Sequence, residues 1–332
     1  MHMKMKNLAV AMTFIALSAN ADIYMAGDST MCNYPARQYP KWGWGQALGE
    51  FMKNPDQLHN WAIGGRSARS FKEEGRWQKL MDALKPEDSV IVAFGHNDSN
   101  RGKAERYSTP EEFKERMKAF ATDVRAKGAE IVFATSVPHS GSLSKDGEGK
   151  THMRASAAGL GPYVAATLKA GEELKVPVID LNDFGRVHFE EIGMDKAIKY
   201  YMRIEPNEYL AFPNGCGDGC HLRDTGAFCF AKKMVEEAFA RNLPIAKYFK
   251  PVDEVKHALV GYAGPGTKAK PIKDDFSKEE IGYANEDGTP YDPYFGDWRA
   301  EMRDLERHAR SIGEKNPRAW AAAEFRRRHP KK

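Results

Sequence analysis

Short apolar runs alternate with longer amphipathic segments along the chain from residue 22 to about residue 248. Short, nearly continuous apolar runs are typical of strands buried on both faces of a parallel sheet. The clearest run covers 88–94 and ends at Gly95. The pattern predicts strands at 23–26, 57–63, 88–94, 131–135 and 176–180.

The segment that begins at Thr109 carries the clearest helix signals. Thr109-Pro110-Glu111-Glu112 supplies an N-cap residue, a proline at the first helical position and the glutamate of a capping box. Apolar residues then recur at helical spacing on one face, and Gly128 ends the segment. These apolar residues are Phe113, Met117, Phe120 and Val124.

Weaker periodicity predicts further helices at 67–84, 155–174 and 223–241. Strands that alternate with helices, without hairpin signals, predict an α/β fold in which helices cover both faces of a parallel sheet, a three-layer α/β/α sandwich. The connections at 138–153 and 195–219 are long for such a fold. Long loops above the carboxyl ends of strands are often functional, and tolerated surface insertions are the alternative.

The first 21 residues differ from the rest. Lys4 and Lys6 precede an apolar run at 8–17, and Ala19-Asn20-Ala21 offers a small-residue cleavage site. This is the pattern of a secretory signal, and the run is too short to span a bilayer. We therefore expect residues 1–21 to be a signal peptide, with a secreted or periplasmic mature protein, and a buried N-terminal strand or helix as the alternative.

Residues 251–332 form a predicted C-terminal extension that follows a catalytic domain at 22–250. Residues 251–297 show little periodicity, 297–313 has a helical pattern, and 326–332 is a basic run. The formal net charge of the whole chain is +4, and eleven Lys/Arg against six Asp/Glu lie from residue 297 onwards. The positive charge therefore belongs to the tail. A solvated extension is one interpretation, and retention on an anionic polysaccharide or cell envelope is the other.

Four cysteines, Cys32, Cys216, Cys220 and Cys229, become candidates for disulfides if the chain is exported. Four cysteines allow three pairings, and the sequence does not choose among them. Cys32 follows Ser29 closely, so it is a candidate partner of Cys216 or Cys220. The spacing of Cys216 and Cys220 to the histidine that follows is also compatible with zinc, although no second Cys/His pair follows.

A candidate nucleophile and base are separated by almost two hundred residues. Ser29, in Gly27-Asp28-Ser29-Thr30, follows the first predicted strand, whose carboxyl end is where an open α/β sheet places its chemistry. His221 lies in Asp218-Gly219-Cys220-His221, which is expected to be a glycine-containing turn on which Asp218 can reach back to the imidazole and stabilise its charged form. A turn or helix-capping role is the alternative for Asp218.

Three predicted strands end in groups that can donate hydrogen bonds to an oxyanion. Gly64-Gly65 allows a backbone N–H to approach a substrate closely, and Asn97 offers a side-chain amide. The backbone N–H of Ser29 is the third donor. Each glycine alone is also an ordinary turn residue.

The order of these blocks resembles the SGNH (GDSL) hydrolase superfamily. The four blocks are Gly27-Asp28-Ser29-Thr30, the glycine of the second block, Gly95-His96-Asn97-Asp98 and Asp218-x-x-His221. The segments 62–71 and 90–98 are similar to those of rhamnogalacturonan acetylesterases. The resemblance covers about 22–245. Cys220 departs from the family pattern, and nothing in that pattern accounts for 251–332.

The resemblance implies a flavodoxin-like sheet and a secreted serine esterase that needs no metal or organic cofactor. It implies Ser29 as nucleophile, His221 as base, Asp218 as its partner, and Ser29, Gly65 and Asn97 as the oxyanion hole. The expected reaction removes O-acetyl groups from pectic polysaccharide, rhamnogalacturonan, through an acetyl-serine intermediate. The alternatives are a deacetylase of xylan or another glycan, a short-chain lipolytic esterase, and a non-catalytic glycan-binding protein.

Further residues are weaker candidates for substrate contact. Arg66 and Arg69 are candidates to attract a uronate carboxylate or to brace neighbouring loops. His139 ends a strand on the side of the candidate site. Asp28 is expected to bond the loop backbone and not to transfer protons. The expected partner is an acetylated polysaccharide, with no nucleic acid and no membrane insertion.

Overall fold

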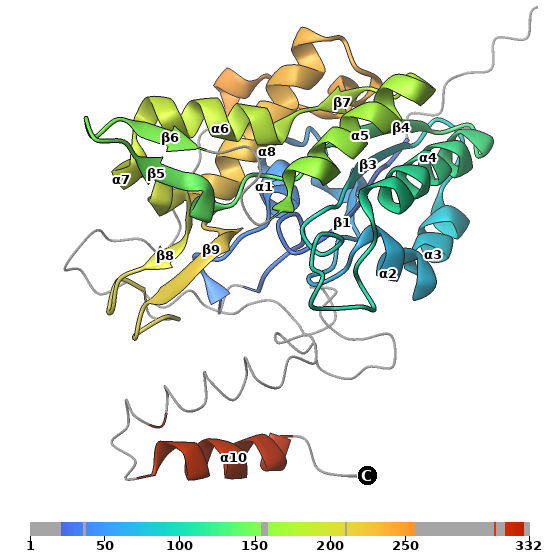
Figure 1. The fold of residues 1–332 in the computed structure, drawn as a ribbon. Coiled ribbons are helices and arrows are strands. Elements are labelled where there is room, and N and C mark those ends of the chain that lie inside the picture. Colours follow the sequence, from blue (N-terminus) through green and yellow to red (C-terminus); the bar gives the residue numbers. More distant parts are fainter. Residues whose placement is uncertain are drawn as a thin grey trace, which may run out of the picture.

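The computed structural model describes residues 21–35, 38–153, 159–209, 211–255, 309 and 316–328. Five strands form one parallel sheet in the order β2-β1-β3-β4-β7, with the first strand of the chain inside the sheet (Figure 1). The predicted central run is β3, which is buried throughout. The five strands are β1 Ile23–Gly27, β2 Leu58–Asn60, β3 Ser89–Ala93, β4 Glu130–Ala134 and β7 Val178–Ile179.

Helices cover both faces of this sheet (Figure 1), which confirms the predicted α/β sandwich. Alternate residues of β1 point to the two cores: Ile23 and Met25 to one, Tyr24 and Ala26 to the other. One face carries α1 Trp44–Leu48, α6 Leu181–Ile192 and α8 Asp224–Ala240, and the other α2 Ala68–Glu73, α3 Arg76–Ala83, α4 Pro110–Ala126 and α5 Gly161–Leu174.

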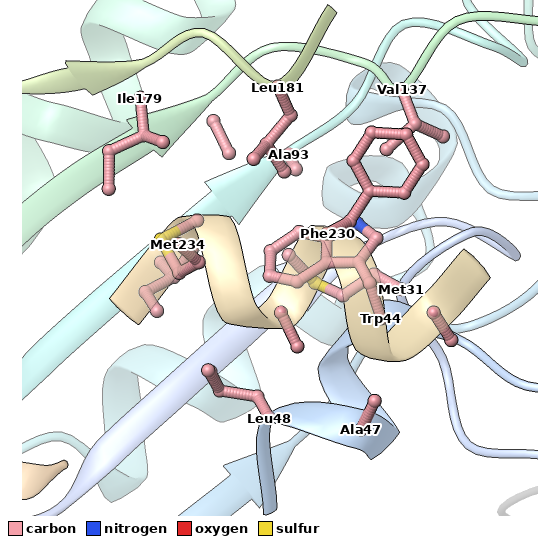
Figure 2. Packing of buried hydrophobic residues seen from close by; sticks show 14 of the residues in the cluster. Met31, Trp44, Ala47, Leu48, Ala93, Val137, Ile179, Leu181, Phe230 and Met234 are labelled. Atoms are coloured by element: carbon pink, nitrogen blue, oxygen red, sulfur yellow. The ribbon is translucent and has the colours of Figure 1, made fainter. Parts of the chain in front are cut away.

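The larger core lies between the sheet and helices α1 and α8. Figure 2 shows Phe230 and Met234 of α8 beside Trp44 and Leu48 of α1, and all four side chains are at most 1% exposed. Burial of a large apolar side chain stabilises a fold by about 1.5–3 kcal/mol. This packing fixes α8, and with it the strand that precedes α8, against the main sheet.

The helix predicted from Thr109 is α4, and its capping box is present. The Thr109 hydroxyl accepts from the Glu112 N–H at 3.3 Å, and the Glu112 carboxylate accepts from the Thr109 N–H at 2.8 Å. The single helix predicted at 67–84 is wrong, because α2 and α3 are separate. Gly75, with φ +75°, lies between them in the left-handed region that favours glycine.

The expectation that the chain lacks hairpins is also wrong. Two antiparallel ribbons form at the predicted long connections: β5 Leu143–Lys145 with β6 Thr151–Met153, and β8 Tyr201–Ile204 with β9 Cys216–Leu222. The strands are short or glycine-rich, so they carry no alternating apolar pattern. The other short elements are α7 Met194–Ala197 and the 3₁₀ turns η2 Gly49–Phe51, η3 Pro55–Gln57, η4 Ser140–Ser142, η6 Ile198–Tyr200, η7 Pro244–Tyr248 and η8 Val252–Glu254.

Both terminal predictions concern residues that lie mainly outside the described part of the chain. The predicted signal peptide is described only at Ala21, and the predicted helix at 297–313 only at Ala309. A helix, α10, covers Pro317–Arg328, for which the sequence pattern predicted no helix, and it includes the first three residues of the basic run at 326–332. Val252 and Val255 pack against the larger core, so the packed domain extends slightly past residue 250. In the described segments, no helix is long and apolar enough to cross a membrane.

Candidate active site

Ser29 lies on a tight turn directly after β1, and Asp28 holds that turn. The Asp28 Oδ1 atom accepts from the Thr30 backbone N–H at 2.9 Å and from the Thr30 hydroxyl at 2.8 Å. Ser29 is 6% exposed, and its carbonyl accepts a hydrogen bond of 2.6 Å from the Tyr34 hydroxyl. Asp28 therefore bonds the loop, as predicted, and the serine is fixed by its own backbone.

Asp218 and His221 form a close pair within β9. The Asp218 Oδ2 atom lies 2.5 Å from His221 Nδ1, and Oδ1 accepts from the backbone N–H groups of Cys220 and His221 at 2.8 and 3.1 Å. The predicted contact is present, although on a strand and not on a simple turn. An aspartate in this position holds the ring with Nδ1 as donor, which leaves Nε2 to accept a proton.

The electrostatics of Asp218 favour its charged form. Burial raises the pKa of its carboxyl, but the charge and hydrogen bond of His221, followed by the charge of Lys41 and the Cys220 N–H, outweigh that effect. The pKa of Asp218 therefore lies far below its ordinary value. A carboxylate that stays ionised is suited to stabilise a charged imidazole.

Tyr34 connects the serine turn to the histidine. Its hydroxyl bonds the Ser29 carbonyl, and its ring lies edge-on to the His221 ring at a centroid distance of 6.3 Å. No direct hydrogen bond joins the Ser29 hydroxyl to His221 in the described part of the chain. Catalytic hydrogen bonds are often long in ligand-free enzymes and tighten only on substrate binding.

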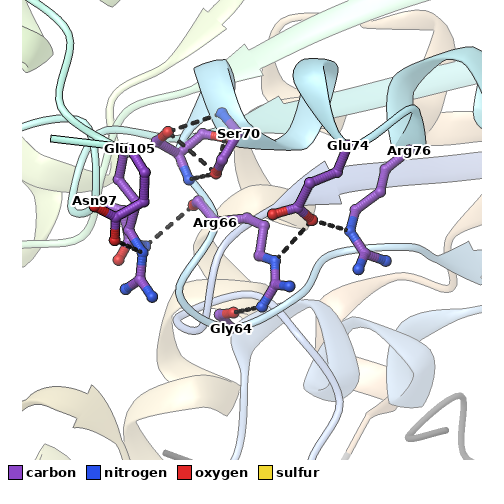
Figure 3. A network of polar contacts seen from close by, with 9 residues as sticks. Gly64, Arg66, Ser70, Glu74, Arg76, Asn97 and Glu105 are labelled. Carbon is purple, nitrogen blue, oxygen red and sulfur yellow. Dashed lines mark hydrogen bonds and ion pairs between the residues drawn. The ribbon is translucent and has the colours of Figure 1, made fainter. Parts of the chain in front are cut away.

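The predicted oxyanion donors follow three neighbouring strands. Ser29 follows β1, Gly65 follows β2 and Asn97 follows β3, and β1 pairs with both others. Gly65 has φ +75°, a conformation that favours glycine. The Asn97 amide donates to the Arg66 carbonyl at 3.1 Å (Figure 3), and an amide has a second N–H. The topology thus brings the three predicted donors to one edge of the sheet.

Arg66 and Arg69 were candidates either to attract a uronate carboxylate or to brace neighbouring loops, and their contacts are those of loop bracing. Arg66 Nε donates to Glu74 at 3.0 Å, and Nη1 donates to the Gly64 carbonyl at 3.2 Å (Figure 3). Arg69 donates to Glu73 at 2.9 Å and to the backbone carbonyls of Ala104 and Tyr107. Their guanidinium groups are already engaged by acidic and carbonyl oxygens, so the structure favours loop bracing.

Two histidines flank the Asp218–His221 pair. His139 is half-buried, and its Nδ1 accepts from the Gly141 N–H at 3.1 Å; burial first, and then the neighbouring His96, lower its pKa. His96 Nδ1 lies 3.7 Å from Cys220 Sγ, while its buried Nε2 has no partner in the described part of the chain. His96 is not among the site residues predicted from the sequence, although it stands in the same block as Asn97.

The candidate disulfides do not form. No disulfide joins Cys32, Cys216, Cys220 or Cys229, and the two thiols nearest the site have separate contacts. The Cys32 thiol lies 3.8 Å from the Ser29 carbonyl, whereas the Cys220 thiol contacts His96. Among the residues described, no group of three or more His, Cys, Asp or Glu side chains is arranged to hold a metal ion.

Comparison with known proteins places this geometry among esterases. Residues 25–226 match the GDSL-like Lipase/Acylhydrolase family. The chain is 34% identical over 223 residues to the rhamnogalacturonan acetylesterase RhgT of Bacillus subtilis, covering 67% of this chain and 91% of that protein. It is 32% identical over 230 residues to the probable rhamnogalacturonan acetylesterase YesY of the same organism, covering 68% and 95%.

A solved structure agrees with the fold. The crystal structure of the YxiM protein of Bacillus subtilis superimposes with a TM-score of 0.56 at 29% sequence identity, covering 68% of this chain and 57% of that chain. The matched family segment begins within β1 and ends early in α8, so it contains the serine turn, the strand ends that carry Gly65 and Asn97, and the Asp218–His221 pair.

Proposed function

Because the chain belongs to the GDSL-like lipase/acylhydrolase family and is a serine carboxylic ester hydrolase, we propose that it removes O-acetyl groups from rhamnogalacturonan. The observation that carries this proposal is the similarity, over about two thirds of the chain, to relatives described as rhamnogalacturonan acetylesterases. The site supports it with an Asp218–His221 pair next to the turn of Ser29.

In the first half of the proposed reaction, the Ser29 oxygen forms a bond to the acetyl carbonyl carbon, and its proton passes to His221 Nε2. Asp218, at 2.5 Å from Nδ1, stabilises the imidazolium that forms. The negative oxygen of the tetrahedral intermediate accepts from the N–H groups of Ser29, Gly65 and Asn97. The sugar oxygen then leaves with the proton from Nε2, and an acetyl-serine remains.

In the second half, a water molecule gives a proton to His221 and its oxygen attacks the acetyl carbonyl. The second tetrahedral intermediate collapses, the Ser29 oxygen takes the proton back, and acetate leaves. A base positioned in this way contributes about 10²–10⁴-fold to a rate. The same three donors serve both halves, because the oxyanion forms at the same place each time.

We also propose that the protein acts outside the cytoplasm. The support is the lysine-flanked apolar run and the small-residue motif at 19–21 in the sequence. A polysaccharide substrate fits this location, because such polymers do not enter the cytoplasm intact. Detection of a mature chain that begins near Asp22 in the secreted or periplasmic fraction tests the proposal, and an uncleaved cytoplasmic chain contradicts it.

The substrate proposal is tested by acetate release from acetylated rhamnogalacturonan beside acetylated xylan at equal acetyl content. We expect faster release from rhamnogalacturonan, and the loss of both activities in Ser29→Ala. Ser144→Ala is a matched control, because Ser144 is exposed on β5, outside the proposed constellation. Faster release from xylan overturns the substrate, and an active Ser29→Ala enzyme overturns the mechanism.

A further inference from the structure

Two cationic residues lie on the two edges of the strand that carries Asp218 and His221. Arg203 of β8 pairs with Gly217 in the antiparallel ladder along one edge of β9. On the other edge, the Leu222 carbonyl accepts from the Trp42 N–H at 3.1 Å, next to Lys41. The β8 strand and the 41–42 segment therefore hold β9 between them.

The guanidinium of Arg203 lies against the backbone beside Asp218. A Cβ atom on Gly219 would stand only 3.0 Å from Arg203 Nη2 and 2.2 Å from the Ser140 hydroxyl, so glycine permits this close approach. Arg203 is exposed, and its Nε donates a long hydrogen bond of 3.4 Å to the Ser140 hydroxyl. The terminal nitrogens of a guanidinium present a fork of donors that matches a carboxylate.

Lys41 lies along the other edge of β9, near the end of the strand that carries His221. Its ammonium lies 4.7 Å from the centroid of the Tyr34 ring, whose edge faces His221. Its charge is one of those that lower the pKa of Asp218, which places it within electrostatic reach of the pair. The aromatic face holds the ammonium by a cation–π contact and leaves its three N–H donors for other partners.

Neither Arg203 nor Lys41 makes an ion pair within the described residues, whereas Arg66 and Arg69 do. Arg66 pairs with Glu74, which Arg76 shares, and Arg69 pairs with Glu73. Arg203 and Lys41 therefore keep N–H donors for a ligand on the two edges of the strand that carries His221. An anionic group next to the acetylated sugar is the chemical complement of this arrangement.

We propose that Arg203 and Lys41 bind the carboxylates of uronate residues next to the acetylated sugar, so that the enzyme selects acetyl esters on acidic polysaccharides. This inference deepens the proposed function and rests on it for the position of the reacting ester. Arg203 makes the directional contact, because its fork fits a carboxylate, and Lys41 adds a point charge on the opposite side of β9. Selection then depends on the charge of neighbouring sugars and not on the acetyl group.

The test compares one polymer in two charge states: acetylated galacturonan with free carboxylates, and the same polymer after methyl esterification. We expect the wild-type enzyme to prefer the free acid, and this preference to weaken with added salt. Arg203→Ala raises KM for the free acid about tenfold with less than a twofold change in kcat, the effect of one lost charge-assisted hydrogen bond. Arg203→Lys restores part of the loss, and Lys41→Gln reduces the preference in the same direction.

Lys169→Ala is the matched control, because it removes one exposed positive charge on α5 that pairs only with exposed Glu172. It keeps the wild-type ratio of activities. The inference is overturned if the wild-type enzyme treats both polymers alike, or if Arg203→Ala loses activity equally on both. If rhamnogalacturonan is not deacetylated but the free-acid galacturonan is preferred through Arg203, the proposed natural substrate fails and this inference stands.

Discussion

Asp98 offers a direct test of how the turn after β3 is built, through the pH dependence of stability. Its side chain is fully buried, and both carboxylate oxygens accept from the Ala68 N–H, at 3.1 and 3.2 Å. Ala68 begins α2, so this carboxylate joins the turn of Asn97 to the helix that follows Gly65. In Asp98→Asn the amide oxygen can still accept from Ala68, but the titration is removed.

The magnitude follows from the shifted pKa. Burial raises the pKa of Asp98 from 3.8 to about 7, against the opposing hydrogen bond from Ala68. Between these values the folded protein binds more protons at this site than the unfolded chain does, so stability falls as the pH rises. The slope is about 1.4 kcal/mol per pH unit, and over the roughly three units the loss approaches about 4 kcal/mol. The contribution of protonated Asp98 is complete below pH 4 and is lost as the pH rises through 7.

The measurement is urea unfolding of wild type and Asp98→Asn between pH 4 and pH 8, followed by tryptophan fluorescence. Subtracting the free energy of unfolding of wild type from that of Asp98→Asn cancels the titrations that both proteins share. We expect this difference to shift in favour of the variant as the pH rises. Glu172→Gln, an exposed carboxylate on α5, controls for the loss of a negative charge. A difference between wild type and Asp98→Asn that is constant with pH refutes the reasoning.

Three further substitutions test other parts of the site. Asp218→Asn lowers kcat on an activated acetate ester by about 10²–10⁴-fold with KM little changed, because the proposed base loses its partner. A tenfold or smaller effect contradicts that role. Asn97→Ala lowers kcat by about 10²–10³-fold if its amide serves the oxyanion, and unaltered steady-state rates remove it from that group. Gly65→Ala lowers the free energy of unfolding by about 1 kcal/mol or more in thermal unfolding, because the backbone at Gly65 has φ +75°. The control Gly147→Ala changes that free energy by at most about 0.5 kcal/mol, because a Cβ atom there meets open space.

The sequence predicts the main sheet well for a physical reason. Strands β1, β3 and β4 are buried on both faces, so almost every residue in them must be apolar and the run is visible without tertiary information. Helix α4 is visible because its cap and its apolar face depend on neighbours within the helix. The division between α2 and α3 is less visible in the sequence, because a single glycine within a helical pattern is compatible with a continuous helix as well as with a break.

The ribbon of β8 and β9 is the part of the site that the sequence hides. Cys216-Gly217-Asp218-Gly219-Cys220 contains none of the alternation or β-branched residues that mark a strand. It becomes a strand because β8 supplies its ladder and because Leu222 and Tyr201 are fully buried at its end. The sequence therefore identifies Asp218 and His221 but predicts a turn for them, and it gives no signal for Arg203, whose position depends on this pairing.

Ser29 and His221 are held in place by different parts of the fold: the main sheet positions Ser29, and the β8–β9 ribbon positions His221. The serine turn follows a strand inside the main sheet, so the packing of both cores fixes it. His221 lies within the β8–β9 ribbon, which is held by a hydrogen bond of 2.7 Å from the Tyr201 hydroxyl to the Pro138 carbonyl and by the entry into α8. Ser29 therefore depends on the main sheet and His221 on the ribbon, and Tyr34 contacts both, through its hydroxyl to the Ser29 carbonyl and its ring beside His221.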